Sequence, residues 1–470
     1  MLIAFSVSLP LSVVRANASA GTYYVSKAAS SVGDGTSWAD AWNELDKINW
    51  SVIKPGDTIY LDGGSTSMMY ATPLIIGANG THGSPITIKL STEKGRNGQA
   101  IIYGGRSTLL PEGGAYPNGW KLPTDQPNRK VPYGIYWDNK SYITIDGSKW
   151  KGIDIHGCND SGIYLKGSNN MVMGITVYDC GSWGKSQERA YSGAPQNPAI
   201  FLGGPNNTIA YCILHDCGED GIQAEQHTDC SNIIIDHTWI YNSRAHSQRD
   251  SSFNWAMHSD AFQYWAPGNF TNITIQNSIM GPGCGVILGE GKCIVSDVSF
   301  INSLFIGFNT RTGTQQIQGL SKNATGWAWD HCTIAGPHRQ AYTPIEYTGF
   351  KPSIKNSIIS GWSQGVELAD HALVVSNNFV EFDNIVNVVN RKDIIDVPLG
   401  KVADPQYVNP SFAHVGGAGW DAFDFTPQNA EVAHSGAGST IRSVSGLMST
   451  FPGGNSISSK TPKTDEPASH

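Results

Sequence analysis

Two short stretches of the sequence share one pattern, an aspartate followed by a small residue, an apolar residue and a glutamine: Asp220 to Gln223 and Asp260 to Gln263. Two neighbouring carboxylates repel each other, so one of them has a raised pKa or a cation lies between them. The first case suits glycoside hydrolysis by a carboxyl pair, and the second suits Ca²⁺, with Glu225 as a further oxygen ligand. Alternatively, each aspartate caps a turn by accepting hydrogen bonds from backbone amides.

Two segments, 181–197 and 243–259, are rich in basic and aromatic side chains. Together with the residue Trp265 that comes after them, they contain Trp183, Lys185, Arg189, Tyr191, Arg244, His246, Arg249, Trp255 and His258. Aromatic rings stack on the apolar faces of sugars, and guanidinium groups bind carboxylates in pairs. The segments therefore predict binding of an acidic polysaccharide, although solvated charged loops are the alternative interpretation. The expected substrate-binding residues are Arg189, Arg244, Arg249, Trp183, Trp265, Gln223 and Gln263.

Three functions are consistent with these residues. In a polysaccharide lyase, arginine or Ca²⁺ neutralises the carboxylate of a uronate, and His258, Tyr191 or Lys166 removes the C5 proton, so that the bond breaks by β-elimination. In a glycoside hydrolase, Asp220 and Asp260 share the acid and base duties. The third function is a glycan-binding protein without catalysis, because a fold alone never establishes an activity. The two basic segments favour the lyase.

The elements that position these residues repeat about every 22 residues from residue 134 onward. Units such as "SGIYLKGSNNMVMGITVYDC" and "PAIFLGGPNNTIAYCILHDC" each hold a short apolar strand, a Gly/Asn turn and a second β-branched strand. Short, regular strands separated by Gly and Asn are typical of a solenoid in which each coil stacks on the next. The sequence therefore predicts an all-β parallel β-helix, with Asn170, Asn207, Asn232 and Asn272 in left-handed turn conformations.

The first strand of each coil can be placed in register by its inward apolar residue. These inward residues are Ile163, Ile200, Ile222, Phe262 and Val286. The next position then points outward and holds Gln223 and Gln263, while Lys166, Glu225 and Trp265 point outward two positions further on. Asp220 and Asp260 fall at the start of adjacent coils, beside the two inserted segments. Because insertions in a solenoid collect on the binding face, we expect the active site there.

The N-terminal part resembles a known family. The stretches "TYYVSKAASSVGDGTSWADAWNELDKIN", "IKPGDTIYLDGG" and "ITIKLS" look like the first coils of right-handed parallel β-helix proteins of the pectate-lyase-like superfamily. With the repeat, this resemblance covers most of residues 22–420. It implies a secreted enzyme that cuts polysaccharides.

A second resemblance concerns the acidic and glycine-rich motifs. "EDGI", "SDAF" and "GPGCGVILGEG" are similar in order to those of polygalacturonase-type hydrolases, with Asp220, Asp260 and the turn at 281–283 as the matching positions. The chain departs from that family at Pro282, which stands where the family has a histidine.

The bulk composition limits the partners of the protein. The 470-residue chain has a net charge of −8, so it has no overall basic field to hold nucleic acid. An apolar run that ends in small residues, with cleavage after Ala16 or Ala18, predicts a signal peptide over residues 1–20 and an extracellular protein. No later stretch has the roughly 18 apolar residues that span a bilayer, so we expect no membrane segment in the mature chain.

We expect one catalytic domain over residues 21–450. Its parts are a leading segment (21–133), regular coils (134–380) and an irregular C-terminal part (381–450), followed by a disordered tail (451–470). A solenoid with capped ends needs no second copy, which predicts a monomer.

Eight cysteines are too few for a disulfide scaffold and have no zinc-site spacing. Cys158, Cys180 and Cys217 occupy matching places in consecutive repeats. Either a disulfide or a ladder of buried thiols fits this column, and the thiol ladder is the favoured interpretation.

Overall fold

The structure is a computed structural model. It describes residues 20–30, 33–104, 133–158, 160–180, 198–217, 220–224, 229–241, 260–264, 267–282, 284–289, 293–307, 317–337, 343–363, 365–368, 374–382, 388–390, 399–410 and 421–452.

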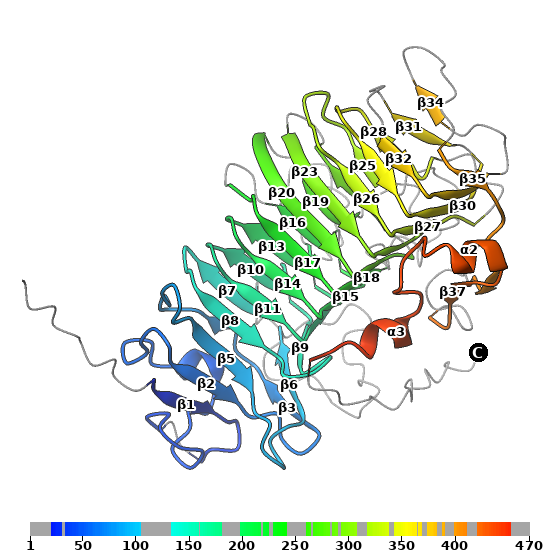
Figure 1. The fold of residues 1–470 in the computed structure, drawn as a ribbon. Helices are drawn as coiled ribbons and strands as arrows, with labels where there is room; N and C mark the ends of the chain where they lie inside the picture. Colours follow the sequence, from blue (N-terminus) through cyan, green and yellow to red (C-terminus); the bar gives the residue numbers. More distant parts are fainter. Residues whose placement is uncertain are drawn as a thin grey trace, which may run out of the picture.

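Three long parallel sheets wind around one core, and each turn of the chain adds one strand to each sheet (Figure 1). Sheet A contains β1 (Thr22–Val25), β2 (Thr58–Leu61), β5 (Ile86–Leu90), β8 (Ile143–Asp146), β11 (Met171–Met173), β14 (Thr208–Ala210), β17 (Ile233–Asp236), β20 (Gly268–Gln276), β23 (Cys293–Ile301), β26 (Ala328–Asp330), β29 (Ser353–Lys355) and β32 (Val374–Ser376).

Sheet B follows sheet A in each coil. It contains β3 (Ser67–Tyr70), β6 (Gln99–Tyr103), β9 (Ile153–His156), β12 (Ile175–Tyr178), β15 (Ile213–His215), β18 (Trp239–Tyr241), β21 (Ile279–Met280), β24 (Leu304–Ile306), β27 (Thr333–Ala335), β30 (Ile358–Trp362), β33 (Phe379–Phe382) and β35 (Lys401–Val402).

Sheet C opens each coil. It contains β4 (Leu74–Ile75), β7 (Ile135–Asp138), β10 (Ile163–Lys166), β13 (Ile200–Gly203), β16 (Ile222–Ala224), β19 (Asp260–Tyr264), β22 (Gly285–Leu288), β25 (Ile317–Gly319), β28 (Ile345–Tyr347), β31 (Val366–Leu368) and β34 (Val388–Asn390). The predicted all-β parallel β-helix is confirmed, and its stacking begins before residue 134 and extends past residue 380.

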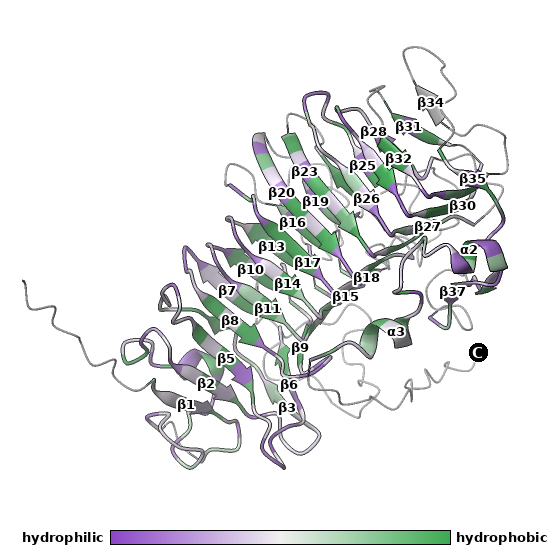
Figure 2. Cartoon of the chain, viewed as in Figure 1, coloured by the Kyte–Doolittle hydropathy of each residue, from purple (hydrophilic) through white to green (hydrophobic). Residues whose placement is uncertain are grey.

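The predicted register of sheet C is confirmed. Ile163 pairs with Ile200, Ile200 with Ile222, and Ile222 with Phe262, and each of these side chains is fully buried. The inward column is apolar in every coil because the inner faces of the three sheets enclose the core and are shielded from water. Figure 2 shows this pattern, with hydrophobic residues along the strands and hydrophilic ones at the bends.

Asparagines stabilise the corner between sheets C and A. Asn207 is fully buried; its Oδ1 accepts from the backbone N–H of Asn170 at 3.0 Å, and its Nδ2 donates to the carbonyls of Gly167 and Gly204 at 2.9 and 2.8 Å. Asn232 and Asn272 have the expected left-handed conformation, with φ values of 58° and 60°.

The turn prediction was wrong for Asn170 and Asn207. The preceding residues, Asn169 and Asn206, take the left-handed conformation instead, with φ values of 59° and 60°. The bend needs one such residue, and the second asparagine points inward, where its amide supplies hydrogen bonds that the corner backbone otherwise lacks.

The C-terminal part of the described chain packs across the outer face of sheet B (Figure 1). It consists of β36 (Tyr407–Asn409), which pairs antiparallel with β37 (Asp424–Pro427), and of α2 (Ala430–His434) and α3 (Val444–Met448). Phe423, Phe425 and Leu447 form a second apolar cluster with outward side chains of sheet B, among them Trp239 and Leu304. This segment therefore covers an apolar face that the coils leave open.

The remaining helical turn is a short 3-10 helix, η1 (Leu45–Lys47), before the first complete coil. Within the described residues, none of the helices has the length and apolar character that crossing a bilayer requires.

The eight cysteines are all buried free thiols. Burial raises the pKa of Cys180 and of Cys217 well above the usual range, and both thiols interact within the column that Cys158 begins. The favoured thiol ladder is therefore what the structure contains.

We expect replacement of Asn207 by alanine to lower the free energy of unfolding by about 2 to 4 kcal/mol, because buried backbone groups lose their partners. Chemical denaturation measures this change. Thr208→Ala, on the half-exposed outer face of sheet A, is the matched control and should change stability by less than about 0.5 kcal/mol. Equal stability of the two variants would contradict the role of the asparagine corner.

We also expect the folded protein to react very slowly with a thiol reagent such as Ellman's reagent, because the reactive thiolate is disfavoured by burial. After unfolding in guanidinium without reductant, eight equivalents should react. A lower number after unfolding would mean that a disulfide is present.

Candidate functional site

The bend that joins sheet B to sheet C differs greatly in length from coil to coil. After β12 and β18 the chain runs through about twenty residues before the next strand of sheet C, whereas after β9 and β15 it needs only six. The two basic segments of the sequence belong to the long bends. The bends between sheets B and C therefore concentrate the variable part of the chain at one edge of the stack, where binding residues are commonly found.

Asp220 and Asp260 lie at the start of adjacent coils, as predicted. The backbone N–H of Asp260 donates to Oδ1 of Asp220 at 2.8 Å, and the N–H of Gly221 donates to the carbonyl of Asp260 at 2.8 Å. The Asp220 side chain is fully buried, and Asp260 is 5 % exposed. Asp220 thus caps the start of the following coil. This is the alternative role considered from the sequence, in which the aspartate accepts hydrogen bonds from backbone amides.

The two glutamines form a buried amide pair beside Asp220. Nε2 of Gln223 donates to Oδ2 of Asp220 at 3.1 Å and to Oε1 of Gln263 at 3.0 Å. Gln223 and Gln263 are only 2 % and 3 % exposed. Their predicted register is confirmed, and in this arrangement they position Asp220 and join two coils.

Both carboxylate oxygens of Asp220 take part in hydrogen bonds within the fold. Oδ1 accepts from the backbone N–H of Asp260 and Oδ2 from Nε2 of Gln223, so a cation would have to use the remaining lone pairs of the carboxylate. Within the described part of the chain, no group of three or more His, Cys, Asp or Glu side chains is arranged to hold a metal ion. Glu225 lies outside the described residues.

A row of partly exposed aromatic rings follows the outer face of sheet C toward the N-terminal end of the stack. This aromatic strip consists of Tyr133, Tyr136, Tyr164 and Phe201. The rings of Tyr136 and Tyr164 are 5.0 Å apart, and those of Tyr164 and Phe201 are 5.1 Å apart and nearly parallel. Because neighbouring rings of the strip stack face to face, the strip presents ring edges and hydroxyl groups outward.

Lys166 lies on the same face as the aromatic strip. It pairs in register with Asp138 of β7, two positions beyond Tyr164 and Tyr136. Its predicted outward position is thereby confirmed, and it places a positive charge beside the rings. The other predicted catalytic and binding residues lie outside the described residues: Trp183, Arg189, Tyr191, Arg244, Arg249, His258 and Trp265.

Asp160 and Tyr133 were not identified from the sequence. Burial raises the pKa of Asp160, while hydrogen bonds from Ser161 and from the hydroxyl of Tyr133 act in the opposite direction. Burial and the Asp160 charge also raise the pKa of Tyr133. The pair places a carboxyl group beside the aromatic strip. Its signal in the sequence was weak, because Asp160 precedes the coil start by one more position than Asp220 does.

His215 was also missed, although the repeat contained a signal for it. Aligning "ITVYDC" with "CILHDC" and "TWIYNS" places His215 in one column with Tyr178 and Tyr241, and the structure confirms this column. Nδ1 of His215 lies 2.7 Å from the Asp216 carboxylate.

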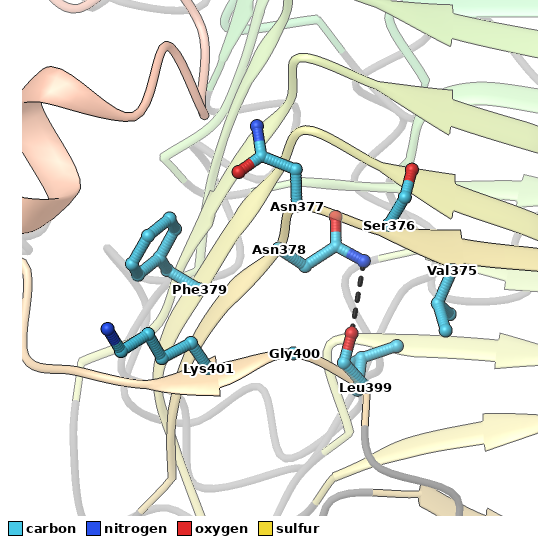
Figure 3. A pocket seen from close by; sticks show the side chains of 8 residues that line it. All are labelled: Val375, Ser376, Asn377, Asn378, Phe379, Leu399, Gly400 and Lys401. Atoms are coloured by element: carbon cyan, nitrogen blue, oxygen red, sulfur yellow. Dashed lines mark hydrogen bonds between the residues drawn. The ribbon is translucent and has the colours of Figure 1, made fainter.

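A hollow lies at the far end of the stack, lined by residues of β32, β33 and β35 and the turns between them (Figure 3). Its volume is about 380 Å³, and Nδ2 of Asn378 donates to the carbonyl of Leu399 at 3.1 Å within it. It belongs to the last coils, whereas Asp220 precedes the fifth strand of sheet C. The hollow is therefore separate from the bends that carry the candidate site.

If Asp220 is a cap, Asp220→Ala should lower the free energy of unfolding by about 2 to 3 kcal/mol, because two buried N–H donors lose their acceptor. Asp220→Asn keeps one acceptor oxygen and should cost less. Asp138→Ala, at an exposed position of sheet C, is the control for stability. Unchanged stability of Asp220→Ala would refute the capping role, and unchanged activity of Asp220→Asn and Asp260→Asn would refute a catalytic one.

Comparison with known proteins concerns the fold. A family model described as a right-handed beta helix region matches residues 129–253. Among solved structures, pectate lyase Pel9A is 14 % identical over 76 % of this chain and 79 % of its own, with a TM-score of 0.47. An alginate lyase from Paenibacillus sp. str. FPU-7 is 16 % identical over 77 % of this chain and 97 % of its own, with a TM-score of 0.38.

A rhamnogalacturonan lyase is 14 % identical over 82 % of this chain and 87 % of its own, with a TM-score of 0.45. No curated protein sequence matches the chain. At these identities the likeness is one of architecture. The matched region and the three stacked sheets identify the chain as a right-handed parallel β-helix protein, as its resemblance to the pectate-lyase-like superfamily implied.

Proposed function

We propose that the protein is a secreted enzyme that degrades a polysaccharide, and that it cleaves an acidic glycan by β-elimination. The observation that carries this proposal is the aromatic strip with Lys166 beside it, on the sheet into which the long bends lead. The strip crosses consecutive coils about 4.8 Å apart, so it is a linear surface suited to an extended chain of sugars rather than to a compact ligand.

The polar ring edges of the aromatic strip and the positive charge of Lys166 suit a sugar that carries a negative charge. Tyrosine hydroxyls donate hydrogen bonds to sugar oxygens, and the Lys166 ammonium attracts a uronate carboxylate. The sequences of the two long bends, which lead into sheet C, contain further arginines and histidines. Neutralising the carboxylate acidifies the neighbouring C5 proton, which is the step that β-elimination requires. His258 and Tyr191 stay predictions for the base, and Lys166 is the third of these predicted bases.

The arrangement of Asp220 favours a lyase over the hydrolase. A glycosidase needs two carboxyl groups that both reach the bond to be cut, one as acid and one as base or nucleophile. Asp220 is fully buried and accepts hydrogen bonds through both oxygens. We therefore propose no acid or base duty for Asp220.

Export from the cell and a monomeric state belong to the same proposal. Both follow from the predicted signal peptide and from the solenoid with its covered sheet B. A glycan polymer outside the cell is a substrate that only an exported enzyme can reach.

The proposal is tested by incubating the purified protein with alginate, pectate and neutral glucans while absorbance near 235 nm and reducing ends are read in parallel. β-Elimination leaves a C4–C5 double bond, so both signals should rise together on an acidic glycan only. Reducing ends without the absorbance would show a hydrolase. No signal on any glycan, together with binding to one of them, would show a glycan-binding protein.

Tyr164→Ala tests the aromatic strip. It should raise KM on the active glycan about tenfold, because it removes a hydroxyl and breaks the stack of Tyr136 and Phe201. Thr144→Ala, on the outer face of sheet A, is the matched control and should leave KM unchanged. Loss of activity when a chelator is added to the same assay would show that a cation such as Ca²⁺ takes part, and unchanged activity would show that the reaction needs none.

A further inference from the structure

Five aromatic rings form a continuous ladder at the ends of the sheet B strands, where the chain turns toward sheet C. They are Tyr103, His156, Tyr178, His215 and Tyr241. His215 lies between Tyr178 and Tyr241 with ring centroids at 5.1 and 4.7 Å and interplanar angles of 4° on both sides. Its ring is therefore held in one plane by its neighbours.

Each histidine of the ladder is bonded to an aspartate. Nδ1 of His156 is 2.6 Å from Asp154, and Nδ1 of His215 is 2.7 Å from Asp216. An ionised carboxylate only accepts hydrogen bonds, so Nδ1 carries the proton and Nε2 of the neutral ring keeps its lone pair. A histidine oriented in this way is prepared to take a proton at Nε2, and the carboxylate stabilises the cation that forms.

The two pairs differ in their access to solvent. The side chains of His156 and Asp154 are 7 % and 12 % exposed, whereas those of His215 and Asp216 are 18 % and 19 % exposed. The coils before and after His215 carry the long bends, and its own bend reaches Asp220 within five residues. His215 is thus the accessible histidine of the ladder at the edge that carries the candidate site.

Within the described residues, two carboxylates lie beside the part of the ladder that holds His215. Asp216 holds the His215 ring through Nδ1, and the Asp216 and Asp421 carboxylates both act on the neighbouring hydroxyl of Tyr241.

We propose that His215, oriented by Asp216, is the group that transfers the proton in glycan cleavage; this inference rests on the function proposed above. Nε2 takes the C5 proton of the uronate, and the electrons of the C5–H bond form the C4–C5 double bond. The bond from C4 to the glycosidic oxygen breaks, and the imidazolium returns its proton to that oxygen. The atoms balance without water or any other reactant, and His215 ends neutral.

The first test replaces the imidazole by a ring that cannot carry a proton. His215→Phe keeps an aromatic ring between the two tyrosines and should lower kcat by at least about 100-fold with little change in KM. His156→Phe makes the same change at the buried pair and should keep kcat within about threefold. Full activity of His215→Phe would overturn the proposal.

The second test distinguishes proton transfer from support of the ladder. His215→Ala opens a slot between two parallel tyrosine rings, and added imidazole should restore part of the lost kcat in proportion to its concentration. Imidazole should not help His215→Phe, whose slot is filled. If imidazole fails to restore activity to a folded His215→Ala, His215 has a structural role only and the proposal is wrong.

A third measurement separates this inference from the proposed function. Diethyl pyrocarbonate should modify His215 in the folded protein, as peptide mass analysis would show, and the active glycan should protect it. This inference alone would be refuted if the wild-type protein cleaves a glycan, the glycan does not protect His215 from modification, and the His215 variants keep their activity. A wild type that neither cleaves nor binds any glycan would refute both.

Discussion

The structure depends on hydrogen bonds that no coil can make by itself. In the three long sheets, each inner strand pairs in parallel with the strands of the coils before and after it, so the backbone of one coil is satisfied by its two neighbours. The same condition applies at the corners, where backbone groups leave the sheets. Asn207 supplies the missing partners at one corner and Asp220 at another. Each coil needs a polar side chain at the same corner to bond the backbone of its neighbour. Polar residues at equivalent positions of successive coils therefore form columns.

That condition explains where chemistry can be placed. The bend between sheets B and C lengthens after β12 and β18, and the strands on both sides of each bend resume their pairing, with one register irregularity between Asp260 and Phe262 of β19. A new segment at this edge costs little more than the closure of a loop, which grows slowly with length. The described part of the site includes residues in register: the aromatic strip on sheet C and the His215 ladder on sheet B.

Periodicity made the strand positions predictable from the sequence. The inward column from Ile163 to Val286 and the outward positions of Lys166, Gln223 and Gln263 could be assigned because side chains alternate along a strand and coils repeat. Side-chain directions at the bends could not be predicted in the same way. Asn169 rather than Asn170 takes the left-handed turn, and the carboxylate of Asp220 points into the next coil. Asp160 could not be predicted, because its raised pKa depends on burial that only the packed bend provides.

The segment from residue 421 to 452 packs against coils that lie far earlier in the sequence. Phe423 lies against Trp239, and Phe451 lies against Trp150 and Tyr211, so the last described residues return to the first half of the stack. A solenoid normally loses its terminal coils one at a time, because each coil touches only its neighbours. Here the C-terminal segment links distant coils directly and makes their unfolding cooperative. During synthesis, the apolar outer face of sheet B stays exposed to solvent until this segment has been made. A chain truncated before residue 421 would therefore expose an apolar, aggregation-prone surface along about half of the stack.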